Sequence, residues 1–230
     1  MSSKKILFLA IHRPNRSPSQ RYRIECYADY WQQEGYELFQ RSIINANDDR
    51  VLYAQGHLLP KSWVLLKSAV KRLAHVLTAH RYDLIIIQRE AFFLGTSFFE
   101  CLAKYASSAK IIFDFDDAIW LPNVSEGNRR WAFLKNPGKT ATLIKMADAV
   151  VAGNRFLAQY ALPFNAKTIV IPSAIDLRMY PARQPNSYEV KDSVCIGWSG
   201  STTTVQHFET ALPALQIIQQ KYGTKVRFAL

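Results

Sequence analysis

The sequence predicts an α/β protein built on a Rossmann-like parallel sheet and followed by the start of a second, similar unit. Apolar segments of strand length alternate with longer amphipathic segments, the order that is typical of a parallel sheet with right-handed crossovers. The apolar segments are nearly continuous, as in strands that are buried on both faces. With 230 residues and 49% hydrophobic composition, the chain can form one complete core and part of another.

The apolar segments define the strands expected in the first sheet. In chain order they are residues 6–11, 37–44, 83–88, 110–115, 149–152 and 167–171. The segments between them predict helices over residues 18–34, 61–80, 96–106 and 140–146, with a further helix after Asn154. These elements predict a first domain that spans residues 1–177.

The first predicted helix begins at a capping signal. Ser17 stands at the N-cap, Pro18 at the first helical position and Gln20 three residues after the cap, the spacing of a capping box. The preceding loop lacks the G-x-G-x-x-G pattern, so a dinucleotide cofactor is not supported. Arginines around the helix start favour an anion or substrate site there, with a solvated basic surface as the alternative: Arg13, Arg16, Arg21 and Arg23.

The predicted helix over residues 61–80 is amphipathic and basic. Its apolar stripe is expected to pack against the core and consists of Trp63, Leu66, Val70, Leu73 and Leu77. Its opposite face carries Lys61, Lys67, Lys71, Arg72 and His75. We expect this basic face to be solvated, with peripheral contact to an anionic membrane as the alternative.

An acidic stretch follows the predicted strand over residues 110–115. Asp114, Asp116 and Asp117 stand at the carboxyl end of this strand, the edge at which ligands bind in an open parallel sheet. The polar residues 88–90 end the preceding strand and are expected to share that edge. This edge is the predicted functional site.

The composition changes after residue 177. Residues 178–192 contain several prolines and little apolar periodicity, which indicates a linker. A strand over 194–198, a tight turn at Gly200, a helix over 202–222 bent at Pro213 and a strand over 225–230 follow. Because domains rarely fall below about 50 residues, the segment 193–230 is expected to be only the start of a second domain.

The composition limits the classes of function. The formal net charge of +11 suggests anionic partners, but the sequence holds no recognisable nucleic-acid-binding motif. Three scattered cysteines fit a reduced, cytoplasmic chain better than a disulfide scaffold. No apolar run approaches the roughly 20 residues that a membrane span needs.

The acidic stretch allows two enzymatic interpretations. The first is a haloacid-dehalogenase-like phosphatase, and the second is given in the next paragraph. The spacing of Asp114 and Asp116 in FDFDDAIW is that of the haloacid dehalogenase signature, in which an aspartate nucleophile works with a magnesium ion. Ala118 stands where that family carries Thr or Val, and no later acidic pair completes a metal site. A non-enzymatic domain that binds anions or nucleic acid is a further alternative.

A series of motifs along nearly all of the chain resembles the family 4 glycosyltransferases of the GT-B fold. The motifs are SPSQRYR, YDLIIIQRE, KIIFDFDDAIW, ADAVVAGNRFLAQYA, TIVIPSAIDLRMY and IGWSGSTTT. The resemblance implies a retaining, metal-independent enzyme that uses a nucleotide-sugar as substrate and needs no other cofactor. It implies an acceptor-binding domain over 1–177 and a nucleotide-sugar-binding domain that begins at 193.

The same resemblance implies roles for particular residues. Asp116 and Asp117 would be catalytic, although many members carry His-Asp there, so Asp116 departs from the pattern. The implied acceptor-binding residues are Arg13, Ser19, Arg21, Arg23, Arg89 and Asn154, and the implied donor-binding residues are Gly200, Ser201 and Thr202.

The expected partners are a nucleotide-sugar donor and a glycan or lipid-linked acceptor, in the cytoplasm or at the inner face of the membrane. Nucleic acid is not an expected partner. The acidic E-x7-E element of the family would fall beyond Leu230, so residues 1–230 are expected to have little or no transfer activity alone.

Overall fold

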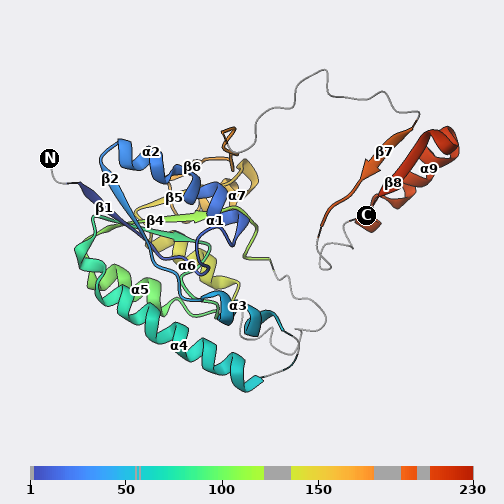
Figure 1. The fold of residues 1–230 in the computed structure, drawn as a ribbon. Helices are drawn as coiled ribbons and strands as arrows, with labels where there is room; N and C mark the ends of the chain where they lie inside the picture. The colour runs from blue at the N-terminus through green and yellow to red at the C-terminus, as the bar shows by residue number, and fades with distance from the viewer. Residues whose placement is uncertain are drawn as a thin grey trace. The chain divides into compact units, whose positions relative to one another are not determined.

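The first part of the protein is a parallel six-stranded sheet with helices on both faces, as a computed structural model shows (Figure 1). The structure describes residues 3–54, 56, 58–121, 136–178, 193–200 and 208–229. The chain forms two units, Met1–Tyr180 and Pro181–Leu230, which are described separately below. The domain limits expected from the sequence, 1–177 and 193–230 with a linker over 178–192, stay predictions.

The sheet confirms the predicted α/β class and its Rossmann-like topology. Its strand order is β2-β1-β3-β4-β5-β6, and every neighbouring pair is parallel. The chain therefore changes direction across the sheet between β1 and β3, and this switch point is where open α/β sheets bind ligands. The strands are β1 (Lys4–Phe8), β2 (Tyr36–Gln40), β3 (Leu84–Gln88), β4 (Lys110–Phe115), β5 (Ala149–Ala152) and β6 (Thr168–Val170).

Two of the predicted strands extend too far. β1 ends at Phe8 and β2 ends at Gln40, although Leu9 and Ile43 are completely buried. These residues lie in the loops that follow the two strands, and both pack into the core. Leu9 N still donates to Ile86 O of β3 at 3.0 Å, so an apolar run continues past the end of the regular strand.

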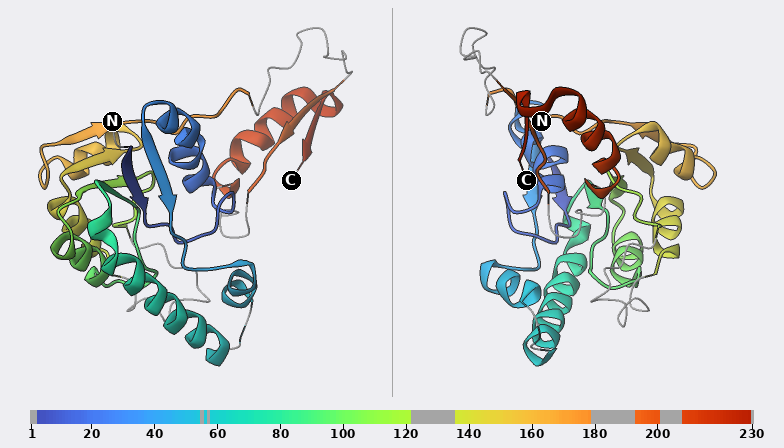
Figure 2. Two further views of the ribbon diagram at one scale, coloured as in Figure 1. Left: turned by 60° about the vertical axis from the view of Figure 1, so that its left-hand side comes forward. Right: turned by 90° about the vertical axis from the view of Figure 1, so that its right-hand side faces the viewer.

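The two faces of the sheet carry different helices (Figure 2). One face packs the larger core against α4, α5, α6 and α7, and the other packs Ile6, Phe8 and Ile86 against Ile24 and Trp31. The helices of the first unit are α1 (Pro18–Arg23), α2 (Ala28–Gln33), α3 (Ala46–Tyr53), α4 (Leu58–Leu77), α5 (Phe98–Ala106), α6 (Gly138–Met146) and α7 (Arg155–Ala161), with 3-10 turns η1 (Glu25–Tyr27) and η2 (Ala79–Arg81).

The predicted helix over 18–34 is divided into α1, η1 and α2, and its capping box is absent. Ser17 is the N-cap of α1, but its side chain makes no capping hydrogen bond. The side chain of Gln20 instead accepts a hydrogen bond from His12 N at 3.0 Å and donates to His12 O at 3.1 Å. A capping box does form at α3, where Asn45 and Asp48 bond reciprocally to each other's backbone amides.

The orientation predicted for the long basic helix is wrong. α4 buries Val64, Ser68, Arg72 and Val76, whereas the stripe that contains Trp63 is exposed. A helical period of apolar residues identifies an apolar stripe, but it does not determine whether that stripe faces the core or the solvent. The buried Arg72 decides the orientation here.

Arg72 joins α4 to three loops at the carboxyl edge of the sheet. Its guanidinium is fully buried and donates to the carbonyl oxygens of Ala91 at 2.8 Å, Arg41 at 3.2 Å and Ala10 at 2.5 Å. These carbonyls follow β3, β2 and β1. Burial lowers the pKa of Arg72, and the three carbonyl oxygens replace the water that the cation has lost.

The second unit contains a parallel pair of strands and a helix. β7 (Val194–Gly197) pairs with β8 (Val226–Ala229), and α9 (Leu212–Tyr222) and η6 (Gly223–Lys225) precede β8. Pro213 lies in the first turn of α9, so it begins this helix and does not bend it as predicted. The earlier part of the predicted helix, 202–207, lies outside the described residues.

In the part of the chain that the structure describes, none of the helices has both the length and the apolar character needed to cross a membrane.

We predict that Arg72→Met destabilises the first unit by about 3–5 kcal/mol, because three carbonyl oxygens, two of them in buried hydrogen bonds, lose their donors. Arg72→Lys should recover only part of this loss, since an ammonium cannot reproduce the planar set of donors. Urea unfolding measures the effect, and Lys71→Gln on the same helix is the control. A loss below about 1 kcal/mol in the methionine variant would contradict the role of Arg72.

A second prediction concerns Asp148, which precedes β5 and accepts from Ile111 N at 3.0 Å, Lys104 at 2.9 Å and Lys110 at 3.2 Å. Although burial alone would raise its pKa, these partners hold the pKa well below the ordinary value. Asp148→Asn should therefore cost about 1–2 kcal/mol at neutral pH.

A carboxylate with a lowered folded-state pKa stabilises the protein above its unfolded pKa, about 4, and loses this contribution as the pH falls below that value. The stability difference between wild type and Asp148→Asn should shrink accordingly from pH 7 to pH 3. Denaturation at both pH values tests this, and a difference that stays constant would show that Asp148 acts only as a neutral acceptor.

Candidate functional site

The carboxyl edge of the sheet brings together polar side chains and one glycine from separate parts of the chain. Ser19 lies on α1, Arg89 follows β3, Asp116 and Asp117 follow β4, and Gly153 follows β5. They meet because the carboxyl ends of parallel strands lie at one edge. Sequence reasoning placed the residues after β3 and β4 at this edge, and the register pairs Gln88 with Asp114 there.

Asp116 has one carboxylate oxygen bound and one buried oxygen without a partner. Ser19 Oγ donates to Asp116 Oδ2 at 2.5 Å, while Asp116 Oδ1 accepts no hydrogen bond within the described residues. A buried carboxylate oxygen normally has a donor. This oxygen therefore has the capacity to accept a hydrogen bond from a ligand hydroxyl.

Gly153 allows the backbone to approach Asp116 closely. A Cβ added at Gly153 would lie 3.1 Å from Asp116 Cα and 3.4 Å from an Arg23 guanidinium nitrogen. The Gly153 amide also donates to Phe115 O at 2.9 Å, which fixes the spacing of the two strand ends. Sequence reasoning noted only the turn after β5 and missed this contact, because the packing depends on a neighbour 37 positions earlier in the chain.

Asp117 pairs with Arg89 across the ends of β4 and β3. The two charged groups lie 2.9 Å apart, and 63% of the Asp117 side chain is exposed. Arg89 has a left-handed backbone with φ of 61°, and its amide donates to Asp114 O at 2.8 Å. This backbone conformation is costly for a residue with a side chain, so the surrounding structure must hold it in place.

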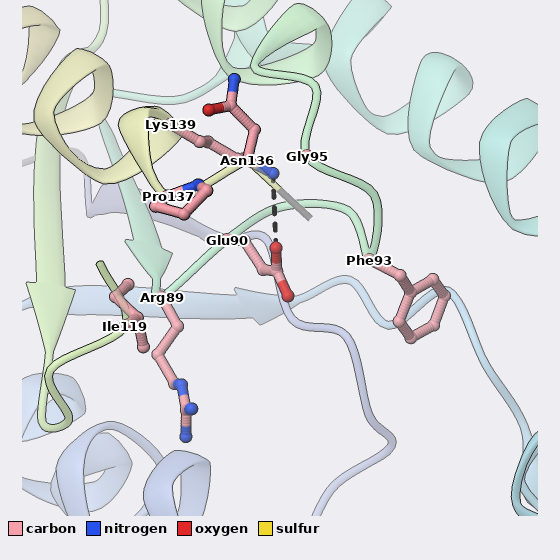
Figure 3. A pocket seen from close by; sticks show the side chains of 8 residues that line it. All are labelled: Arg89, Glu90, Phe93, Gly95, Ile119, Asn136, Pro137 and Lys139. Carbon is pink, nitrogen blue, oxygen red and sulfur yellow. Dashed lines mark hydrogen bonds and ion pairs between the residues drawn. The ribbon is translucent and has the colours of Figure 1, made fainter. Parts of the chain in front are cut away.

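A pocket of about 330 Å³ lies beside Arg89 and is shown in Figure 3. Lys139 anchors its wall: its buried ammonium lies 3.1 Å from Glu100 and 3.5 Å from Glu90, and donates to Phe92 O and Leu94 O. These bonds hold the loop after β3 in one conformation. The lining residues are Arg89, Glu90, Phe93, Gly95, Ile119, Asn136, Pro137 and Lys139.

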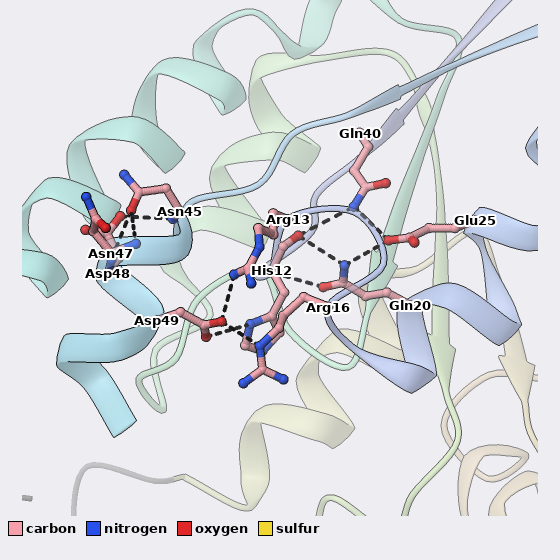
Figure 4. Close-up of polar contacts among 10 residues, drawn as sticks. All are labelled: His12, Arg13, Arg16, Gln20, Glu25, Gln40, Asn45, Asn47, Asp48 and Asp49. Atoms are coloured by element: carbon pink, nitrogen blue, oxygen red, sulfur yellow. Dashed lines mark hydrogen bonds and ion pairs between the residues drawn. The ribbon is translucent and has the colours of Figure 1, made fainter. Parts of the chain in front are cut away.

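The arginines that precede α1 are paired with a carboxylate that sequence reasoning missed. Arg13 and Arg16 donate to Asp49 of α3 at 2.7 and 2.5 Å (Figure 4). Burial would raise the pKa of Asp49, but these hydrogen bonds lower it. His12 lies 3.9 Å from Asp49, and burial lowers the pKa of its imidazole. Arg13 is therefore held by the protein itself, with 40% of its side chain exposed.

Arg23 is buried and connects three segments of the first unit. Its guanidinium binds Asp114 with a closest distance of 2.6 Å and donates to Ile171 O at 2.9 Å and Ser173 Oγ at 3.2 Å. Burial alone would lower the pKa of Arg23, but the bonds to Asp114 raise it. This pair connects α1 to β4 and to the segment after β6, so the acceptor-binding role predicted for Arg23 does not fit its geometry.

Two further predicted acceptor-binding residues also have local partners. Arg21 stacks on the Tyr22 ring, with 4.6 Å between the guanidinium carbon and the ring centroid. Asn154 is the N-cap of α7 and accepts from Leu157 N at 2.9 Å. Of the six residues predicted to bind an acceptor, Ser19 donates to Asp116 and Arg89 pairs with Asp117.

The predicted donor-binding turn lies in the second unit. Gly200 follows β7 and is exposed, while Ser201 and Thr202 lie outside the described residues. Among the residues with a described position, no group of three or more His, Cys, Asp or Glu side chains is arranged to hold a metal ion.

Comparison with protein-family models and with curated proteins finds no match to this chain.

We predict that Gly153→Ala lowers the free energy of unfolding by about 1–3 kcal/mol, because the added methyl group must displace the backbone of Asp116. The matched control is Gly197→Ala at the end of β7, where an added Cβ meets no atom within 4 Å. Urea unfolding of both variants checks this, and equal stability of the two would contradict the close approach.

Proposed function

We propose that this protein is a glycosyltransferase of the retaining, metal-independent kind and resembles family 4 of the GT-B fold. In this proposal the first unit binds the acceptor, and the segment that begins at 193 contributes to binding the nucleotide-sugar. The unpartnered Oδ1 of Asp116, at the carboxyl edge of the sheet, is the observation that carries the proposal. The ordered series of motifs supports it independently.

The chemistry assigned to the edge is the positioning of an acceptor hydroxyl. The hydroxyl donates to Asp116 Oδ1, and Ser19 holds the other carboxylate oxygen so that the group cannot rotate. The hydroxyl oxygen then bonds to the anomeric carbon of the donor on the face from which the diphosphate departs, as retention requires, while the bond from that carbon to the diphosphate breaks and the hydroxyl proton passes to Asp116 Oδ1. The nucleoside diphosphate leaves with the electron pair, and its charge requires hydrogen-bond donors in the nucleotide-sugar-binding segment.

The exposed pair of Arg89 and Asp117 provides the second contact. Asp117 accepts from further hydroxyls of the acceptor sugar, and Arg89 orients its carboxylate at 2.9 Å. The adjoining pocket of about 330 Å³ has the size of a small-molecule site. An acceptor sugar carried on a lipid would bring this cytoplasmic protein to the inner face of a membrane.

The geometry of Asp114 favours this proposal over a haloacid-dehalogenase-like phosphatase. The nucleophilic aspartate of such an enzyme needs an oxygen that is free to attack the substrate, yet both oxygens of Asp114 accept hydrogen bonds from Arg23. Burial raises the pKa of Asp114, and Arg23 opposes that shift. Asp114 is thus a structural partner of Arg23.

The experiment is a binding titration of the chain with a panel of glycans. Asp116→Asn should weaken the binding of the tightest glycan by about 10–100-fold, because a charged acceptor is lost. Asp29→Asn, on α2 and 75% exposed in its side chain, is the matched control and should bind unchanged. Release of nucleoside diphosphate from UDP- or GDP-sugars, insensitive to EDTA, is the activity readout for any longer form of the protein.

Four results would overturn the proposal. Glycans could bind Asp116→Asn as tightly as wild type, or could fail to bind at all. Magnesium-dependent hydrolysis of a phosphate ester, lost in Asp114→Asn, would support the phosphatase. Tight, salt-sensitive binding to arbitrary DNA would support a nucleic-acid-binding domain.

A further inference from the structure

The outward side of α4 carries a continuous stripe of large apolar side chains. At 3.6 residues per turn the members fall within an arc of about 80° along the helix. The least exposed of them still shows 37% of its surface. Contiguous apolar surface of this kind marks an interaction site in most proteins that have it. The outward stripe consists of Leu59, Trp63, Leu66, Val70, Leu73 and Leu77.

The stripe faces outward because the opposite side of α4 makes the contacts with the rest of the first unit. Val64, Ser68 and Val76 pack in the first unit, and Arg72 makes its three carbonyl bonds there. Rotating α4 to bury the stripe would turn Arg72 outward and leave the three carbonyl oxygens without their donors. The exposure of the stripe is therefore fixed by the fold.

The charge around the stripe is uniformly basic. The 20 residues of α4 include no Asp or Glu. Lys67 pairs with Asp48 of α3, whereas Lys61 and Lys71 take part in no ion pair within the described residues. Two copies of such a helix would repel each other, while an anionic surface would attract it.

The shape of the surface suits a flat partner. α4 runs along the lower border of the first unit in the left view of Figure 2. Tyr53, at the end of α3, adds an aromatic ring that is 66% exposed next to the start of the helix. A long amphipathic helix that carries apolar, aromatic and lysine side chains is typical of helices that lie in the interface of a bilayer.

We propose that α4 binds an anionic lipid bilayer by lying along its surface. The outward stripe enters the interfacial region, and Lys71, on its flank, contacts the headgroups. This inference depends on the surface of α4 alone and is independent of the proposed transferase function.

The experiment is co-sedimentation of the chain with vesicles of phosphatidylcholine, with and without phosphatidylglycerol. We expect binding to the anionic vesicles at low salt and much less to the neutral ones. The double variant Leu66→Gln/Val70→Gln should lower the partition coefficient roughly tenfold or more, because two inserted side chains are lost. Tyr30→Gln is the matched control, since Tyr30 is also an exposed apolar residue (57%) but lies on α2, over the other face of the sheet.

The contribution of the lysine charges and the depth to which the stripe enters the bilayer are tested separately. Lys71→Gln should weaken binding by roughly fivefold and reduce its salt dependence, whereas Lys61→Gln, on the side of α4 opposite the stripe, should bind unchanged. Brominated lipid should quench tryptophan fluorescence in the wild type, and this quenching should be lost in Trp63→Phe although four other tryptophans remain of the five in the chain. Circular dichroism confirms that each variant is folded.

Several outcomes would overturn the proposal. They are failure of the wild type to sediment with anionic vesicles at low salt, unchanged binding by the double variant, and quenching that persists in Trp63→Phe. A concentration-dependent dimer that dissociates in the double variant, without vesicle binding, would assign the stripe to contact between copies.

Discussion

The buried guanidinium of Arg72 constrains the first unit more than any other single group described above. It reaches the loops after β1, β2 and β3, and so fixes three of the segments that border the carboxyl edge. A cation in a dry core is tolerated only when acceptors replace its water. The loops must therefore adopt the positions that place their carbonyls around it. One side chain thus sets both the shape of the edge and the rotation of α4.

Ion pairs at that edge mainly position the backbone. Asp49 holds Arg13 and Arg16, Asp114 holds Arg23, and Glu100 holds Lys139. Because each carboxylate has an internal partner, most of the charge suggested by the sequence is not free for a ligand. Asp116 differs, since only one of its oxygens is bound within the described residues. The proposed chemistry follows from this difference in hydrogen bonding, and not from the number of charges.

The proposed membrane surface and the proposed site belong to the same unit and share an edge. In a parallel sheet each crossover helix starts at the carboxyl edge and returns to the amino edge. α4 follows that rule, so Leu59 lies toward the edge that holds Asp116, and Leu77 lies toward the start of β3. A bilayer along α4 would meet the first unit beside the edge at which an acceptor on a lipid carrier is proposed to bind.

The sequence by itself determined the α/β class, the parallel sheet, the approximate position of each strand and the edge where Asp116 and Asp117 lie. These properties depend on local patterns, because residues close together in the sequence indicate which strands are apolar on both faces and how strands and helices alternate. The tertiary structure alone decided the partners of Arg13 and Arg23, the contact of Gly153 with Asp116 and the outward side of α4. Each of these depends on a residue far away in the chain, and a buried charge such as Arg72 can reverse the face that an apolar period suggests.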